Sequence, residues 1–458
     1  MSVIVKEYPF NDDPAVLFQR VAHRPGVFFL DSCLRRESRD RYSFLGFDPF
    51  AWIDVTDEAS QRLRRAFSLW RVSTECPVTP LPCGMVGVLA YDVGKAVDPG
   101  KKRIEGVVRA VAGCYDRVAT VDHLARKVYL TSCGWPEQDA RLREQRARQR
   151  LDQMARCLFD PDPGEAAEEV LDGFFGPIRE EMPLAAYLSR ARRALGYIAR
   201  GEIYQVNLTR RFSATGRNIS ASRLYHRLRA MSPAPFAGYF DAGSTKIVSS
   251  SPEGFLRLTG RRVETYPMKG TRPRGRTPQE DIRLKEDLRR SRKDAAELLM
   301  ITDLLRNDLG RVCAYGSIRV PEHRRLEEYA TVFQTTSRIE GRLAKDKDPL
   351  DLLDACFPGG SITGCPKIRA MDIIRELEPV PRGFYTGSLG YLSFTGAMDW
   401  NILIRTMMVQ ADRVEFHVGG GIVADSTPEG EYEETLVKAE AMRRCLEACR
   451  EGAVETGI

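Results

Sequence analysis

Two pairs of acidic residues in the 458-residue chain have a spacing that suits metal binding. Asp294 and Glu297 lie in a helical pattern over residues 284–306. Glu431 and Glu434 lie in a second helical segment near the C-terminus. Residues three apart share one face of a helix. If the two faces meet, their carboxylates can bind one hard cation, for which Mg²⁺ is the natural choice. The alternative is that these acids only solvate a helix surface.

Two glycine-rich stretches could bring backbone close to a ligand. The first, from Pro358 to Lys367, opens a helical pattern but lacks the Gly-Lys-Ser/Thr ending of a phosphate loop, so nucleotide binding is disfavoured. Backbone N–H groups at the start of a helix can instead bind an anion such as a carboxylate. The second stretch is Gly419-Gly420-Gly421. A structural turn is the alternative in both places.

A lysine is the remaining candidate for chemistry. Lys269 follows a strand-like run and stands between Met268 and Gly270. A lysine among apolar and small residues can act as a nucleophile or base, although most lysines are solvated. The five His are isolated and the eleven Cys include no Cys-x-x-Cys, which disfavours a zinc site and a disulfide scaffold.

The elements that position these residues form two parts. Short β-like runs dominate to about residue 160, residues 161–184 have the composition of a linker, and helices and strands alternate over 185–458. The chain is 43% hydrophobic and 29% charged, as in globular enzymes. Its charges are interleaved with a net of only +6, which disfavours nucleic acid as a partner. The absence of an 18-residue apolar run and of a secretory leader predicts a cytoplasmic protein without a membrane span.

Taken together, five segments resemble the chorismate-utilising enzymes. This family includes the large subunits of anthranilate synthase and aminodeoxychorismate synthase. The resemblance covers nearly the whole chain, since Arg41-Tyr42-Ser43-Phe44-Leu45-Gly46 and Tyr91-Asp92-Val93-Gly94 are similar to the family's N-terminal region. The five segments are Ser249-Ser250-Ser251-Pro252-Glu253, Lys269-Gly270-Thr271, Asp303-Leu304-Leu305-Arg306-Asn307-Asp308, Gly360-Ser361-Ile362-Thr363-Gly364-Cys365-Pro366-Lys367 and Gly419-Gly420-Gly421-Ile422-Val423-Ala424-Asp425-Ser426.

The resemblance implies a role for each of these sites. Glu297 and Glu434 match the Mg²⁺ ligands, and Asp294 and Glu431 match the supporting acids. The cation would neutralise the ring carboxylate of the substrate as a leaving group departs. Glu253 matches the proposed general acid that protonates the 4-hydroxyl of chorismate. Positions that bind the substrate are matched by Thr271, Thr363, Gly364, Tyr385, Arg405, Gly419, Gly420, Gly421 and Lys438.

Two positions discriminate within the family. Relatives that add water to chorismate carry Lys where this chain has Gln205, and an amide cannot deprotonate water, so an isochorismate or salicylate synthase is disfavoured. Before Gly270-Thr271, anthranilate synthases typically have Ala and aminodeoxychorismate synthases have Lys, as here in Lys269. One departure is Gln334, which stands where many relatives have His. We therefore expect Lys269 to attack C2 of chorismate and ammonia to add at C4, on the path to 4-aminobenzoate and folate. Synthesis of anthranilate is the alternative.

The resemblance also implies a fold and a partner. We expect an α+β fold of two stacked, mainly antiparallel β-sheets flanked by helices, in which region 1–160 completes the chorismate-binding catalytic domain of 185–458. The sequence has no Gly-x-Cys-x-Gly elbow of a glutaminase, so ammonia is expected from a separate glutamine amidotransferase subunit. Ser32 and Pro233 resemble the region where some family members hold tryptophan. A non-catalytic tryptophan-sensing relative is the alternative, and the retained acids and Lys269 argue against it.

Overall fold

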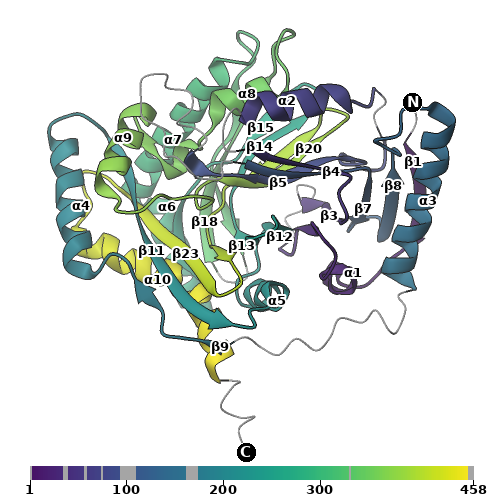
Figure 1. The fold of residues 1–458 in the computed structure, drawn as a ribbon. Coiled ribbons are helices and arrows are strands. Elements are labelled where there is room, and N and C mark those ends of the chain that lie inside the picture. The colour runs from purple at the N-terminus through teal and green to yellow at the C-terminus, as the bar shows by residue number, and fades with distance from the viewer. Residues whose placement is uncertain are drawn as a thin grey trace, which may run out of the picture.

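Two β-sheets stacked face to face form the centre of the molecule. The computed structural model describes residues 3–34, 40–55, 59–73, 76–92, 110–160, 174–329 and 332–451. In these residues all strand pairs between named strands are antiparallel, and helices cover the outer faces of the sheets (Figure 1). Phe28 and Phe44 of one sheet pack with Val86 and Val88 of the other in one buried core. The predicted α+β fold is confirmed.

The first sheet has thirteen strands in the described residues. Strands β9 (Phe174–Phe175) and β19 (Gly364–Cys365) both pair with β11 at its two ends. The other strands, in order of pairing, are β1 (Ile4–Pro9), β8 (Lys127–Ser132), β7 (Arg117–Asp122), β3 (Tyr42–Gly46), β2 (Phe28–Asp31), β12 (Phe236–Asp241), β13 (Lys246–Ser251), β22 (Thr406–Val409), β23 (Arg413–Ile422), β11 (Gln205–Arg217) and β10 (Arg179–Glu180).

The second sheet has ten strands in the same residues. Strand β17 (Arg319–Glu328) pairs with β18 beside the main order. The other strands, again in order of pairing, are β16 (Met268–Pro273), β18 (Val332–Arg342), β15 (Arg262–Thr265), β14 (Gly254–Thr259), β21 (Met398–Asn401), β20 (Ser388–Ser393), β5 (Gly84–Leu89), β6 (Ala110–Tyr115) and β4 (Ala51–Val55).

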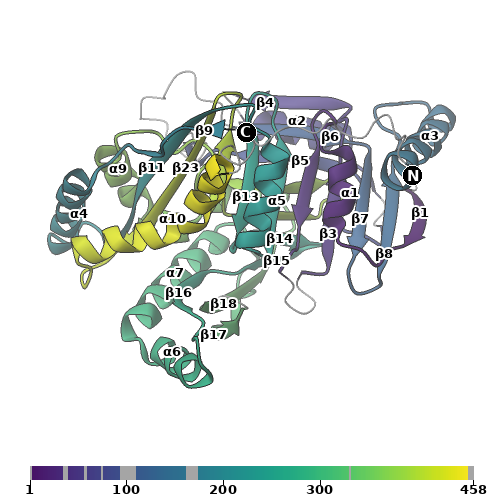
Figure 2. The ribbon, with the colours of Figure 1, turned by 90° about the horizontal axis from the view of Figure 1, so that it is seen from below.

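The helices divide between the two outer faces. Buried residues of α3 (Ala140–Phe159), α5 (Ala221–Met231) and α10 (Pro428–Glu451) pack against the first sheet. Those of α2 (Ala59–Leu69), α7 (Arg292–Gly310) and α8 (Pro349–Cys356) pack against the second. Figure 2 shows α6 and α7 grouped with β16, β17 and β18 at one end of the second sheet. The remaining helices are α1 (Pro14–Val21), α4 (Leu184–Ala199), α6 (Pro278–Arg290), α9 (Lys367–Leu377) and a 3-10 turn over Gly360–Ile362.

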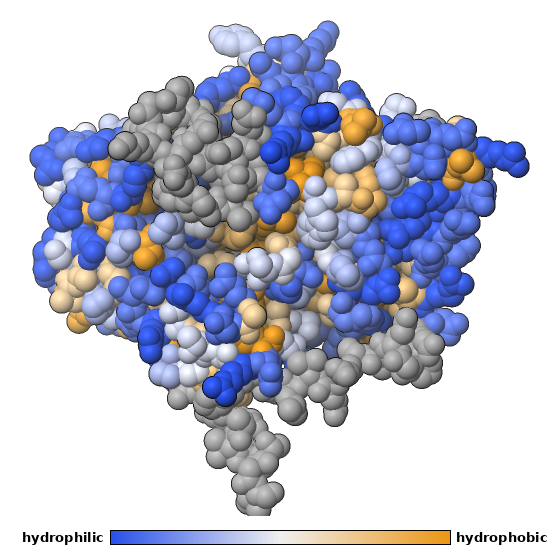
Figure 3. Space-filling view, in the orientation of Figure 1, coloured by the Kyte–Doolittle hydropathy of each residue, from blue (hydrophilic) through white to orange (hydrophobic). Residues whose placement is uncertain are grey.

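The surface is mostly polar on the face shown in Figure 3, where apolar side chains form small scattered groups. Large exposed apolar side chains include Tyr204, Ile368 and Val437. Across the described ranges, none of the helices combines the length and the hydropathy needed to cross a membrane.

Region 1–160 contributes strands to both sheets. Strand β2 pairs with β12, and β5 pairs with β20, so each sheet runs through this region and the rest of the chain. The boundary at residue 160 stays a prediction. Within the predicted linker, residues 161–173 lie outside the described residues, and 174–184 contain β9 and β10, which pair with β11.

The helical pattern predicted over 284–306 is two helices rather than one. Helix α6 ends at Arg290 and α7 begins at Arg292, because Ser291 between them has an extended backbone. The Ser291 hydroxyl accepts the N–H of Asp294 at 3.2 Å, which caps α7. The prediction of one helix was therefore wrong, and the cap starts a new helix just before Glu297.

Candidate active site

Three of the predicted acids converge from two helices. Glu297 lies on α7, Glu431 and Glu434 lie on α10, and electrostatic interaction couples Glu297 to Glu431. Glu431 is buried, and its Oε1 accepts a hydrogen bond of 2.6 Å from Ser426 Oγ. Its Oε2 is buried without a hydrogen-bond partner. A Cβ at Gly420 would lie 2.8 Å from this Oε2, so only glycine lets β23 approach the acids so closely.

Lysines balance the charge of these acids. Burial raises the pKa of Glu297, against the opposing charges of Lys269 and Lys293. The pKa of Glu434 is lowered. Burial acts to raise it, but the positive charge of Lys438, whose Nζ lies 2.6 Å from Glu434 Oε1, acts in the opposite direction and prevails. Lys293 Nζ lies 4.0 Å from Glu297 Oε1 and 3.6 Å from Glu431 Oε1. The sequence analysis did not single out Lys293, although this lysine directly precedes the candidate ligand Asp294 in the chain.

The fourth acid has a different partner. Asp294 Oδ2 lies 3.2 Å from Arg272 Nη2, so its carboxylate is already neutralised from β16. No group of three or more His, Cys, Asp or Glu side chains in the described ranges is already arranged to ligate a metal. The donor atoms of Glu297, Glu431 and Glu434 are nonetheless all hard oxygens, and Glu431 Oε2 has no partner. These three residues therefore fit Mg²⁺.

Lys269 lies near these acids because of a β-bulge in β16. The register of β16 against β18 shifts between Lys269 and Thr271, and Gly270 between them has a φ of +72°. A side chain at Gly270 would collide with Leu288, whose Cδ1 would be 2.7 Å from the added Cβ. Lys269 is half-buried, and its Nζ lies 3.5 Å from the carbonyl oxygen of Ser361. The exposed Thr271 accepts a hydrogen bond of 3.3 Å from the buried amide of Gln334.

Glu253 is buried within electrostatic reach of the same lysine. Burial raises its pKa to about 7, although a hydrogen bond with the Ser361 side chain and the charges of Lys269 and Lys438 oppose the rise. A carboxyl with this pKa is still about half protonated at pH 7 and can donate its proton. This is the property that a general acid needs.

The two glycine-rich stretches meet beside Lys269. Strand β19 pairs with the start of β11, and a Cβ at Gly364 would lie 2.2 Å from the carbonyl oxygen of Gln205. A Cβ at Gly421 would lie 2.8 Å from Gln205 Nε2 and 3.5 Å from Lys269 Nζ. Both polar atoms of the buried Gln205 amide lack a hydrogen-bond partner. Thr363 Oγ1 donates within its own loop, to the carbonyl oxygen of Gly359 at 3.1 Å.

The remaining predicted residues lie on adjoining elements. Arg405 follows β21, has a φ of +50°, and its backbone carbonyl accepts the N–H of Ser250. Burial lowers the pKa of the Arg405 guanidinium, and no carboxylate of the described residues pairs with it. Tyr385 is buried and stacks on His417 of β23 at 5.0 Å, and Lys438 Nζ donates to the carbonyl oxygen of Gly419 at 2.9 Å. Neither Arg405 nor Tyr385 is joined to Lys269 by a hydrogen bond among these residues.

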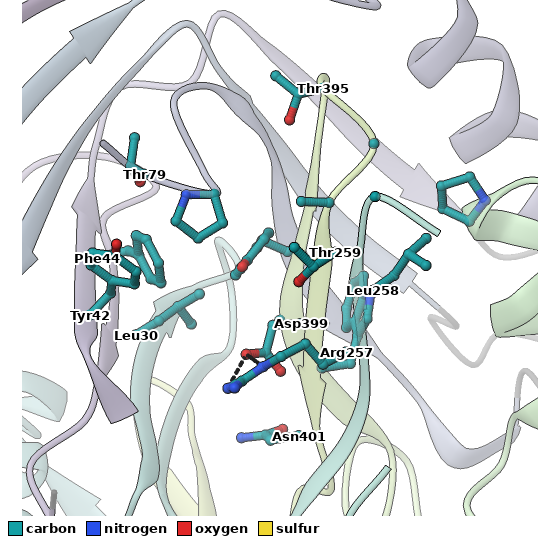
Figure 4. Close-up of a pocket in the computed structure, with 18 of the residues that line it drawn as sticks. Leu30, Tyr42, Phe44, Thr79, Arg257, Leu258, Thr259, Thr395, Asp399 and Asn401 are labelled. Carbon is teal, nitrogen blue, oxygen red and sulfur yellow. Dashed lines mark hydrogen bonds and ion pairs between the residues drawn. The ribbon is translucent and has the colours of Figure 1, made fainter. Parts of the chain in front are cut away.

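A separate cavity of about 780 Å³ lies away from these groups. Figure 4 shows the ion pair of Arg257 and Asp399 on one side of this cavity and Tyr42 on another. Arg257 Nη2 lies 2.7 Å from Asp399 Oδ2. Ser32 lines the cavity, whereas Pro233 does not, although the nearby Pro235 does. Tryptophan binding at Ser32 and Pro233 therefore stays a prediction.

Comparisons with known proteins agree on the family. Residues 28–444 match the family model described as chorismate binding enzyme. The chain is 38% identical over 456 residues to anthranilate synthase component 1 of Thermus thermophilus, covering 96% of each chain. It is 33% identical over 474 residues to aminodeoxychorismate synthase component 1 of Bacillus subtilis, covering 97% of each. It is similar in structure to anthranilate synthase component I from Streptococcus pneumoniae, with a TM-score of 0.77 and 28% identity over 89% of this chain and 93% of that one. The chain therefore belongs to the chorismate-binding enzyme family and is a chorismate-utilising enzyme.

Proposed function

We propose that the chain converts chorismate and ammonia to 4-amino-4-deoxychorismate, the precursor of 4-aminobenzoate in folate synthesis. The observation that carries the proposal is the position of Lys269. Its charge acts on Glu253, Glu297 and Glu434 together, and its Nζ forms no ion pair with a carboxylate of the described residues. A lysine held among the acids that would act on the substrate is placed to form a bond with it.

The reaction proceeds through two allylic displacements. Lys269 Nζ bonds to C2 of chorismate while the C4–O bond breaks, and Glu253 donates the proton with which the hydroxyl leaves as water. Ammonia then bonds to C4, the C2–N bond breaks, and Lys269 recovers its electron pair. The new ammonium group returns a proton to Glu253. Neutral Lys269 is required for the first step, because a protonated amine cannot attack carbon.

Other residues bind the substrate. Arg405, Tyr385, Thr271, Thr363, Gly364, Lys438 and the glycines at 419 to 421 surround the two carboxylates of chorismate. The half-buried guanidinium of Arg405, which pairs with no carboxylate of the described residues, supports this assignment, because a desolvated cation gains most from an anionic ligand. Mg²⁺ held by Glu297, Glu431 and Glu434 supplies neutralisation of the ring carboxylate when it is bound.

Ammonia comes from a glutamine amidotransferase subunit. The support is that a full-length relative is named component 1, which implies a second component. The predicted cytoplasmic location stays part of this proposal. Ammonium salt at alkaline pH should replace the partner, because it supplies free NH₃.

Anthranilate synthesis is the second candidate. The observation in its favour is the 38% identity to a relative that carries that name. Lys269 argues against it, because the resembling anthranilate synthases have a small residue at this position. In that reaction the amino group enters at C2, the carbon that Lys269 would occupy.

Product identification tests the proposal. The purified chain, given chorismate, Mg²⁺ and ammonium salt, should yield 4-amino-4-deoxychorismate. Without ammonia, intact-protein mass spectrometry should find a chorismate-derived adduct that peptide mapping assigns to Lys269. Lys269→Ala should lose the adduct and most of the product, whereas the control Lys246→Ala, which removes a lysine paired with Asp241, should keep both. Anthranilate as the main product of the parent, or full 4-amino activity of Lys269→Ala, would contradict the proposal.

A further inference from the structure

The ammonium group of Lys293 lies between two of the candidate metal ligands, Glu297 and Glu431. Its Nζ is 3.6 Å from Glu431 Oε1 on α10 and 4.0 Å from Glu297 Oε1 on its own helix. Its charge also acts on Glu434. These distances are longer than a direct charge-assisted hydrogen bond, so the ammonium is shared between carboxylates rather than bound tightly to one.

Helix stability does not explain a lysine at this position. Ser291 is the N-cap of α7, which puts Lys293 in the first turn, where the helix macrodipole disfavours a positive charge. Lysine four residues before glutamate is also the weaker order for an ion pair along a helix. The acids of the site therefore account for its placement better than α7 itself does.

The charges near Lys293 show that a divalent cation could replace its ammonium group. Lys438 Nζ lies 2.6 Å from Glu434 Oε1 and balances the negative charge of that carboxylate. Lys293 is the ammonium that lies between Glu297 and Glu431, Glu297 also feels the charge of Lys269, and Oε2 of Glu431 is left without a partner. A divalent cation in the same place would balance both carboxylates. The side chain of Lys293 is 41% exposed, so its ammonium has a path to solvent.

We propose that Lys293 is an internal competitor for Mg²⁺. In the metal-free enzyme its ammonium lies between Glu297 and Glu431 and keeps the two helices together, and Mg²⁺ displaces it toward solvent. Lys293 thereby weakens metal binding and sets the Mg²⁺ concentration at which the site fills. The inference rests on the Mg²⁺ site of the proposed function, and it is independent of which product is formed.

Titration calorimetry with MgCl₂ on enzyme freed of metal by EDTA tests the inference. Removing a partly screened unit charge about 4 Å from two ligands should tighten Mg²⁺ binding by Lys293→Met about tenfold. Lys293→Arg, which keeps the charge, should stay within about twofold of the parent. A matched control is Lys127→Met, which removes a lysine of 40% exposure paired with Glu7 on the first sheet, and it should leave the affinity unchanged.

A second measurement separates competition from simple damage to the fold. Without metal, Lys293→Met should melt below the parent because Glu297 and Glu431 repel each other, and saturating Mg²⁺ should remove the difference. Unchanged or weaker Mg²⁺ binding by Lys293→Met, with normal binding by the parent, would overturn the role of Lys293 alone. If Glu297→Gln binds Mg²⁺ as tightly as the parent, or the parent binds none, the metal site fails and this inference fails with it.

Discussion

Replacing Glu253 by Gln should stabilise the protein at alkaline pH and change nothing in acid. The carboxyl is buried, and its pKa is raised from the usual 4.5 to about 7. Below pH 4.5 the folded and unfolded chains both keep the proton, so burial carries no ionisation cost. Between pH 4.5 and 7 the unfolded chain loses its proton first, and stability falls as pH rises. Above pH 7 the loss is complete. Glutamine is neutral at every pH, so the Glu253→Gln variant does not lose this stability.

The size of the effect follows from the raised pKa. At about 1.4 kcal/mol for each pH unit, ionising the buried carboxyl costs about 3 kcal/mol. The entropy of unfolding is about 2.1 cal/mol/K per residue, so this cost corresponds to about 3 °C in melting temperature for the whole chain. Melting curves of parent and Glu253→Gln at pH 4.5 and pH 8 measure it. Glu440→Gln removes an exposed carboxylate of α10 and serves as the control. An equal offset at both pH values would refute the reasoning, as would a variant that loses stability toward pH 8.

Three further outcomes are expected from substitutions in and around the site. Arg405→Met should raise the KM for chorismate about 100-fold with a smaller change in kcat, because a substrate carboxylate would lose its charge-assisted bond to the half-buried guanidinium; steady-state kinetics measure KM and kcat separately. Glu434→Gln should abolish Mg²⁺-dependent turnover, and full activity of this variant in excess EDTA would contradict the metal assignment. Lys367→Met should cost about 1–3 kcal/mol, seen as a lower melting temperature, because the buried Asp308 then keeps only Arg311 as an ion-pair partner; an unchanged melting temperature would show that the Lys367 pair is dispensable.

The sequence predicted what depends on local pattern. The resemblance to the family's motifs was enough to predict the sandwich of two sheets. The spacing of the acids, three residues apart on two helices, raised the approach of α7 and α10 as one of two alternatives. The break at Ser291 was missed because a serine within a helical pattern is compatible with both an interior position and a cap. The pairing of Asp294 with Arg272 and the approach of Lys293 to Glu431 were missed for another reason. They join residues that only the tertiary fold brings together.

The loop that carries Ser361 and Thr363 is held by two cations, the half-buried Lys367 and the buried Arg382, that take no part in the proposed chemistry. Lys367 pairs with Asp308 and donates to the carbonyl oxygens of Cys356 and Pro358.

Arg382 has a matching role on the other side of the loop. It pairs with Glu378 at 2.7 Å and donates to the carbonyl oxygens of Ile362 and Asn207. Each cation pairs with one acid and also donates to backbone carbonyl oxygens, so the loop is tied both to α7 and to β11. None of these contacts involves Lys269, so the loop should keep Ser361 beside Glu253 when Lys269 is replaced. The covalent role proposed for Lys269 can therefore be tested by substitution without moving the rest of the proposed site.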